Sequence, residues 1–266
     1  DMIIRSLSHD INLGVKSLYV DEAQDLSPLQ WAFIKNASKN VKSLIIAGDD
    51  DQCIYAWAGA SRSGMKEHHD FGNVKILSQS YRVPRSIHKL AQHVISNIND
   101  RVEKNYLPSD REGEIQYHNY IDMVDIDPSS NESVLVLYRN HSSKRELENW
   151  LMRNGVRYRS STQFNSAFTD RYANAVRVFK MIEQGKGLSL SNIQTLQRVA
   201  CQQYKSHIEN KNFTLIKRLG WEGLLNIPFR HVEYLRKVDL SKPATCLLST
   251  IHSAKGMEAD RVILLN

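Results

Sequence analysis

Two short apolar runs that end abruptly in carboxylates constrain the fold of this chain more than any other feature. The first run, Ser17 to Val20, is followed by Asp21-Glu22-Ala23-Gln24-Asp25, and the second, Leu44 to Ala47, is followed by Gly48-Asp49-Asp50-Asp51-Gln52. Apolar runs of this length suit strands buried on both faces of a parallel sheet. The carboxylates then lie at the C-terminal ends of the strands, where open α/β sheets bind ligands.

The residues between the two runs predict a helix. Ser27 is a good N-cap and Pro28 a good first helical residue, so the helix should run from there to about residue 36 or 37. A strand over residues 41–47 follows. This strand–helix–strand order is typical of a βαβ unit, which favours an α/β fold with a parallel sheet.

Adjacent acids at a strand end have a chemical use. Asp21 could hold a Mg²⁺ ion that bridges nucleotide phosphates, and Glu22 could orient and deprotonate the attacking water. Gln52, at the end of the second strand, could contact the terminal phosphate. The alternative for a bare Asp-Glu pair is that the acids cap a helix or solvate a strand end.

The residues after Gln52 make the pattern more specific. They read Cys53-Ile54-Tyr55-Ala56-Trp57-Ala58-Gly59-Ala60. The chain resembles the UvrD/Rep-type superfamily 1 DNA helicases, whose patterns are close to DEFQD and GDDDQSIYGWRGA; the corresponding segments here are DEAQD and GDDDQCIYAWAGA. One departure is Ala58, where the family has Arg. The resemblance implies RecA-like (P-loop NTPase type) parallel sheets flanked by helices, with a short helical insert.

Two further segments carry the same resemblance. Tyr81-Arg82 is similar to the family's QNYR motif, which implies that Tyr81 stacks on the adenine and that Arg82 reaches the γ-phosphate; on its own, Arg82 would read as a surface residue. Thr250-Ile251-His252-Ser253-Ala254-Lys255-Gly256-Met257-Glu258 is similar to TLHSAKGLEF. The resemblance implies that Thr250, His252 and Ser253 contact the DNA backbone. It implies that Gly256 and Glu258 contact the nucleotide.

Tyr55 and Trp57 lie among small residues, on a loop rather than on a periodic apolar face. Aromatic side chains on such a loop can stack on unpaired bases, at roughly 1–3 kcal/mol per base. A Trp that fills a domain interface is the alternative, and the sequence alone favours neither. The resemblance favours DNA binding by both residues.

Further elements follow from periodicity and turn residues. We expect a helix after Pro84 and helical patterns throughout residues 165–243. A strand at 134–139 should be followed by a helix whose N-cap is Ser142 or Ser143. The remaining expected elements are strands at 73–77, 114–119, 134–139, 156–159, 245–250 and 261–266, and helices at 170–184 and 191–209.

The domain division predicted from these elements has three parts. Residues 1–78 would form the C-terminal part of a first RecA-like domain, residues 79–164 and 244–266 an incomplete second one, and residues 165–243 a reduced helical insert. The insert holds 13 basic and 6 acidic residues, a charge of +7 against +6 for the whole chain. Such a surface suits DNA phosphates or simply solvates a helical face.

Composition excludes several classes of protein. The three cysteines are far apart, which predicts neither a disulfide framework nor a zinc site. No apolar run reaches membrane-span length, so we expect no membrane partner and a cytoplasmic location, in a bacterium or in the bacterial host of a phage. The chain lacks G-x-x-x-x-G-K-[ST], so we expect an internal piece of a longer protein that alone hydrolyses ATP poorly or not at all.

The resemblance implies an ATP-dependent DNA helicase or translocase, an ATP hydrolase that uses ATP and Mg²⁺. It would move 3′ to 5′ along single-stranded DNA or act at a junction of single- and double-stranded DNA, together with replication or repair proteins. Three alternatives stay open: the motor part of a helicase–nuclease, a non-catalytic remnant that binds single strands, and an RNA-directed motor.

Overall fold

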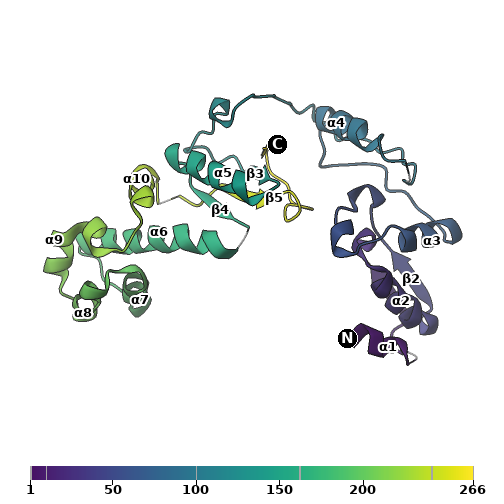
Figure 1. The fold of residues 1–266 in the computed structure, drawn as a ribbon, viewed down its shortest axis with the longest axis horizontal. Helices are drawn as coiled ribbons and strands as arrows, with labels where there is room; N and C mark the ends of the chain where they lie inside the picture. Colours follow the sequence, from purple (N-terminus) through teal and green to yellow (C-terminus); the bar gives the residue numbers. More distant parts are fainter. Residues whose placement is uncertain (1, 10, 100, 162, 241, 266) are drawn as a thin grey trace. The chain divides into compact units, whose positions relative to one another are not determined.

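The computed structural model describes residues 2–9, 11–99, 101–161, 163–240 and 242–265. The chain forms two compact units, Asp1–Tyr117 and His118–Asn266. Figure 1 colours the first unit from purple to blue and the second from teal to yellow. Each unit contains parallel strands flanked by helices, which confirms the expected α/β fold class.

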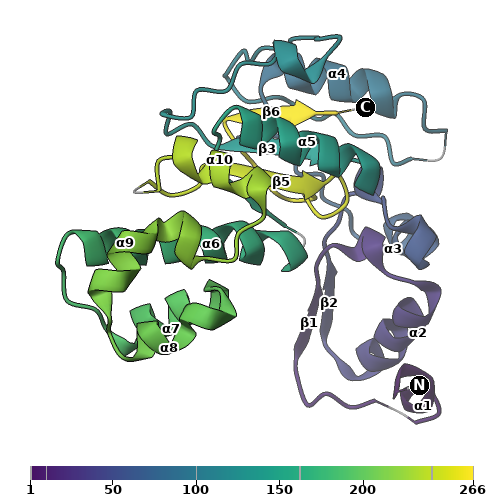
Figure 2. The same cartoon turned by 60° about the vertical axis from the view of Figure 1, so that its left-hand side comes forward.

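The first unit is built on a parallel pair of strands. The pairing runs in register from Ser17 opposite Ser43 to Val20 opposite Ile46. Figures 1 and 2 show α2 beside this pair, so the expected βαβ unit is confirmed. The helices and strands of the unit are α1 (Met2–Leu7), β1 (Ser17–Val20), α2 (Pro28–Ala37), β2 (Ser43–Ile46), α3 (Ser63–Phe71) and α4 (Arg85–Ile95).

The start of α2 follows the sequence prediction closely. The Ser27 hydroxyl accepts a hydrogen bond from the Gln30 N–H, and the Gln30 side chain accepts one from the Ser27 N–H. This reciprocal capping box, with Pro28 in the first turn, fixes the helix start. Further along α2, Trp31 is buried against α3, where a Cβ at Gly64 would come within 2.5 Å of its ring. A glycine is therefore needed for this close helix packing.

Two expectations for the first unit are wrong. Residues 73–77 form no strand: they are exposed and pair with no neighbouring strand in the described part of the chain. Residues 114–117, like 118 and 119 in the second unit, are also not a strand. Both segments have suitable composition, but a strand needs a partner for its backbone groups.

The first unit extends beyond residue 78. Gln79 forms an isolated parallel bridge with Leu107, and the Ser80 N–H donates to the Leu107 carbonyl at 2.9 Å. The segment after α4 returns to the acidic turn at Asp50, where the Val102 N–H donates to its carboxylate at 2.7 Å. These contacts hold residues 79–117 in this unit. The assignment of residues 79–164 to a second RecA-like domain stays a prediction.

The second unit contains a four-stranded sheet in the order β4-β5-β3-β6, with every neighbouring pair parallel. In the views of Figures 1 and 2, α5 lies over β3. The elements that form the sheet and its covering helix are β3 (Val134–Tyr138), α5 (His141–Arg153), β4 (Tyr158–Ser160), β5 (Cys246–Thr250) and β6 (Arg261–Leu264). Trp150, Leu147 and Leu151 of α5 are fully buried against the sheet.

The segment between β4 and β5 is helical, as expected, and α6 packs against α7 and α9. Its helices are α6 (Gln163–Glu183), α7 (Leu190–Val199), α8 (Lys205–Glu209), α9 (Phe213–Leu224) and α10 (Phe229–Lys237). The single helix expected over 191–209 is therefore two, broken at Ala200, whose φ and ψ of −69° and 150° are extended. The cap of α5 is Asn140, not Ser142 or Ser143; its side chain accepts the Ser143 N–H at 2.9 Å.

Among the described residues, no helix combines the length and the apolar character that crossing a membrane requires.

Candidate functional site

The carboxylates expected at the edge of a sheet lie together in the first unit. Asp21 and Glu22 follow β1 directly, and the acidic turn Asp49–Gln52 follows β2. Because the two strands are parallel and paired to their last residues, both acidic segments leave the sheet at the same edge. The Ala23 N–H donates to the Ala47 carbonyl at 3.0 Å and holds the two segments side by side.

Glu22 has an unusual backbone. Its φ of 50° and ψ of 40° lie in the left-handed region, which costs a non-glycine residue roughly 1–2 kcal/mol. The Glu22 N–H donates to Oδ1 of Asp21 at 2.9 Å, and a short 3₁₀ turn, Ala23–Asp25, follows. Both acidic side chains are exposed. The strained residue thus turns the chain sharply at the strand end, where ligand-binding groups are found in folds of this class.

Gln24 lies beneath this turn and is fully buried. Its side-chain Nε2 donates to Oε2 of Glu22 at 2.6 Å, and its Oε1 accepts from the Asp49 N–H at 2.9 Å. The sequence analysis did not single out Gln24 as a site residue. The amide links the two acidic segments through their polar atoms.

The acidic turn is a short 3₁₀ helix, Asp50–Gln52, capped by Asp49. Oδ1 of Asp49 accepts from the Asp51 N–H at 3.2 Å, and Oδ2 accepts from Nε2 of Gln52 at 2.8 Å. The Gln52 side chain, which we expect to contact the terminal phosphate, is exposed and is held by Asp49 rather than by a distant part of the fold.

Two basic residues that the sequence analysis missed hold the acidic turn. The Lys104 ammonium lies 2.5, 2.5 and 2.9 Å from carboxylate oxygens of Asp49, Asp50 and Asp51, respectively. Arg101 makes a two-pronged contact with Asp51, with Nε and an Nη 2.8 and 2.6 Å from its two oxygens. More than 45 residues separate these cations from the acids along the chain, so no local pattern predicts the contacts.

These contacts lower the pKa of Asp51 and raise the pKa of Lys104. Burial raises the pKa of Asp51, but hydrogen bonds and charge from Arg101 and Lys104 outweigh it, so the pKa lies below its usual value. Burial lowers the pKa of Lys104, but its hydrogen bonds to three carboxylates outweigh burial and raise the pKa overall. Asp51 and its two cationic partners, Lys104 and Arg101, are therefore ionised at neutral pH.

The same geometry separates two candidate metal positions. The carboxylates of Asp49, Asp50 and Asp51 lie close enough together to ligate one ion. The Lys104 ammonium already occupies their shared space, in hydrogen-bond contact with all three. Asp21 is exposed at the end of β1 and offers the carboxylate oxygens that Mg²⁺ prefers. The shared space of the acidic turn is thus filled by an ammonium group, and Asp21 stays the predicted magnesium ligand.

The aromatic residues expected to bind DNA follow the acidic turn. Tyr55 directly precedes the short 3₁₀ turn Ala56–Ala58 and Trp57 lies within it; their ring centroids are 6.4 Å apart, and Trp57 is 74% exposed. Tyr81 is also exposed, at 88%, and so is Arg82. Their surface positions leave these rings and the guanidinium accessible to a ligand; their roles stay predictions.

The remaining predicted residues belong to the second unit, at the end of β5. Thr250 Oγ1 accepts from the Ser253 N–H at 3.0 Å, which starts a series of turns through Gly256. The expected strand-to-helix turn is therefore a turn without a following helix. Gly256 has a φ of 77°, which favours glycine. The described side chains expected against DNA or nucleotide are half-buried (Thr250 and His252) or exposed (Ser253 and Glu258).

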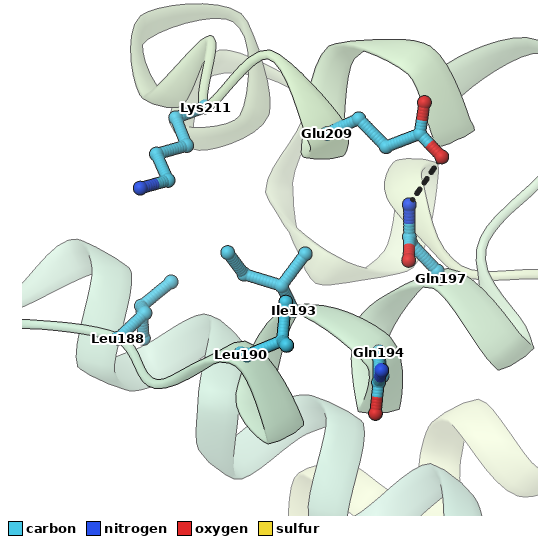
Figure 3. Close-up of a pocket in the computed structure, with 7 residues that line it drawn as sticks. All are labelled: Leu188, Leu190, Ile193, Gln194, Gln197, Glu209 and Lys211. Carbon is cyan, nitrogen blue, oxygen red and sulfur yellow. Dashed lines mark hydrogen bonds between the residues drawn. The ribbon is translucent and has the colours of Figure 1, made fainter.

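A shallow hollow in the second unit lies among the helices of the insert. It measures about 390 Å³, and Figure 3 shows its apolar floor of Leu188, Leu190 and Ile193, with Gln197 donating to Glu209 at the side. None of its lining residues belongs to the motifs described above. The hollow is therefore separate from the predicted chemistry.

The parallel sheets and the acidic strand ends define an α/β fold with polar groups at the C-terminal edge of its first sheet. Residues 5–71 match the family described as UvrD/REP helicase N-terminal domain. These residues contain the Asp21-Glu22 pair, Gln24 and the whole acidic turn. The resemblance to UvrD/Rep-type helicases is confirmed over this part of the chain.

Individual proteins similar to this chain are also named as DNA helicases. The chain is 28% identical over 159 residues to the ATP-dependent DNA helicase PcrA of Staphylococcus aureus, and 26% identical over the same length to PcrA of Bacillus subtilis. It is 31% identical over 158 residues to DNA helicase II of Haemophilus influenzae. In each case the match covers 53% of this chain and spans 22% of the relative.

Proposed function

We propose that this chain is part of an ATP-dependent DNA helicase or translocase that moves 3′ to 5′ on single-stranded DNA. The observation that carries the proposal is the paired strand ends of the first unit, where Glu22 and Gln52 are joined through Gln24 and Asp49. The relatives named above are DNA helicases, and PcrA is named as ATP-dependent. Both names support the same class of reaction here.

The roles of the residues follow from their positions. Glu22 orients the attacking water and accepts its proton, since a carboxylate at a strand end can serve as a general base. Asp21 would hold Mg²⁺, which neutralises charge on the phosphates when bound. Gln52 contacts the terminal phosphate. Arg82 stabilises charge on the transferring phosphoryl group, and Tyr81 stacks on the adenine.

The DNA-binding part of the proposal uses exposed groups (Trp57 and Ser253) and half-buried ones (Tyr55, Thr250 and His252). Tyr55 and Trp57 would stack on unpaired bases, which is tolerant of sequence. Thr250, His252 and Ser253 would contact the DNA backbone through hydroxyl, imidazole and backbone N–H groups. A single strand, or a junction between single- and double-stranded DNA, is the substrate that such a surface suits.

The experiment is ATP hydrolysis by the full-length gene product that contains this chain, with and without an oligonucleotide of deoxythymidine. We expect the strand to stimulate hydrolysis, and streptavidin to be displaced from a 5′-biotinylated oligonucleotide faster than from a 3′-biotinylated one. If DNA binds but does not stimulate any hydrolysis, a non-catalytic binding module would be favoured instead. Faster displacement from the 3′ end would contradict the proposed direction.

A further inference from the structure

Gln24 uses both ends of its side-chain amide at once. Its Nε2 donates to the Glu22 carboxylate at 2.6 Å and its Oε1 accepts the Asp49 N–H at 2.9 Å, and the Gln24 side chain itself is fully buried. Rotating the amide by half a turn would bring donor against donor at Asp49 and oxygen against carboxylate at Glu22. Only one orientation therefore satisfies both partners.

The contacts continue to the second strand end. Asp49, whose N–H is held by Gln24, accepts a hydrogen bond from Nε2 of Gln52 at 2.8 Å. Three hydrogen bonds and one residue of backbone thus connect Glu22 to Gln52. Both ends of this connection are exposed, Gln24 is fully buried and Asp49 is half-buried, so a ligand can reach the ends while the fold fixes Gln24.

Gly48 provides the space that the connection needs. A Cβ at this position would lie 2.6 Å from Oε1 of Gln24 and 3.1 Å from the Ala23 backbone nitrogen. A distance of 2.6 Å is far inside van der Waals contact, and the Gln24 amide is enclosed. A larger residue at position 48 would therefore displace Gln24 from Asp49, even though Gln24 itself is unchanged.

The acidic turn gives the connection a fixed anchor. Lys104 contacts the Asp49 carboxylate and the two following carboxylates, and Arg101 holds Asp51. These charge-assisted contacts are short and largely buried, which restricts movement of the turn. A displacement of Gln52 is consequently transmitted through Asp49 rather than absorbed by a mobile loop.

We propose that Gln24 is a positioning residue that holds the Glu22 carboxylate and couples it to the Asp49–Gln52 turn. A change at Gln52 then reaches Glu22 through Asp49 and Gln24. The catalytic meaning of this coupling rests on the proposed function, in which Glu22 is the general base. The coupling itself is a property of the first unit alone.

The coupling is tested by NMR on the 266-residue chain, without any reaction. Gln52→Ala removes the hydrogen bond to Asp49 at the far end. We expect it to shift the side-chain carboxyl ¹³C signal of Glu22, and we expect this shift to vanish when Gln24→Met is also present. Gly48→Ala should abolish it in the same way. An equal shift with and without Gln24 would overturn the coupling.

The positioning role is tested by kinetics on the full-length gene product. Gln24→Met keeps the size of the side chain but removes both polar contacts. We expect kcat for ATP to fall about 10²-fold, the effect of a misplaced catalytic group, with KM within about twofold of the wild-type value. In a Glu22→Gln background, Gln24→Met should cause no further loss, because the group that it positions is absent.

Asn36→Leu is the matched control, because it also removes a buried side-chain hydrogen bond, from Asn36 to the His9 carbonyl, but in α2. It should lower thermal stability and leave kcat unchanged. An undiminished kcat in Gln24→Met, or equal losses with and without Glu22, would overturn the positioning role. No DNA-stimulated hydrolysis in the wild type would instead refute the proposed function, and the NMR measurement would still decide the coupling.

Discussion

Replacing Lys104 by Met should destabilise the first unit strongly. The Lys104 ammonium is the one described cation that contacts all three carboxylates of the acidic turn, and its side chain is 17% exposed. Methionine keeps the length of the side chain without the charge. The substitution would leave three neighbouring carboxylates without the cation that they share.

The magnitude follows from the burial of the partners. Removing one partner of a buried ion pair costs about 3–5 kcal/mol. Asp51 keeps Arg101, Asp50 keeps the Val102 N–H, and Asp49 is 40% exposed, so water and remaining donors offset part of the loss. We therefore expect the low end, about 3 kcal/mol. With a urea dependence of about 1–3 kcal/mol per molar, the unfolding midpoint should fall by about 1–3 M.

The assay is urea unfolding of the 266-residue chain. Hydrogen exchange of peptides from each unit is the readout, so that the unfolding of the two units is measured separately. Lys42→Met, which changes an exposed lysine of the same unit, is the control and should stay within about 0.5 kcal/mol of the wild type. The loss in Lys104→Met should also become smaller as the pH falls below about 4, because Lys104 helps to lower the pKa of Asp51 and this contribution is lost as Asp51 becomes protonated in the folded state.

A loss below about 1 kcal/mol would refute this reasoning, since that is the value of an exposed ion pair. The same conclusion would follow from a loss that does not change with pH.

Three further predictions concern other parts of the chain. Ser27→Ala removes the capping box of α2 and should cost the first unit about 1 kcal/mol in urea unfolding, whereas Ser38→Ala beyond the helix should cost less. Trp57→Ala should weaken binding of fluorescent single-stranded DNA by about 1–3 kcal/mol without lowering stability, because its ring is largely exposed; unchanged affinity would exclude stacking. Burial, and then the charge of Arg230, lowers the pKa of His231. Below its unfolded pKa of about 6.5 the unfolded state binds more protons, so the second unit should lose stability as the pH falls from 7 to 5, and His231→Phe should reduce this slope.

The elements with local signals could be predicted from the sequence. Ser27 and Pro28 specify the start of α2 through contacts within four residues, and the apolar runs of β1 and β2 need only each other as partners. Asp21 and Glu22 follow the first run directly and Gln52 ends the acidic turn after the second run, so the sequence could assign all three to strand ends; their catalytic roles stay predictions. Their closeness in space then follows from parallel pairing alone.

The parts that depend on distant residues could not be predicted. Nothing near Lys104 or Arg101 in the sequence indicates three carboxylates about fifty residues away. Gln24 was visible in the DEAQD segment, but its burial and its contact with Asp49 depend on the space at Gly48. Residues 73–77 have strand composition without a strand to pair with, and Asn140 outcompetes the nearby serines as a cap because its side chain reaches the Ser143 N–H.

The central claim is that the carboxylate at the end of β1 drives phosphoryl transfer. The most direct measurement is DNA-stimulated ATP hydrolysis by the full-length gene product carrying Glu22→Gln, beside the wild type and the exposed control Glu67→Gln. Glutamine keeps the shape of Glu22 and still accepts a hydrogen bond from Gln24, but it cannot accept the proton of water. We predict that stimulated hydrolysis falls to a small residual rate in Glu22→Gln while binding of ATP and DNA persists and the control stays active. Hydrolysis at the wild-type rate in Glu22→Gln would contradict the account.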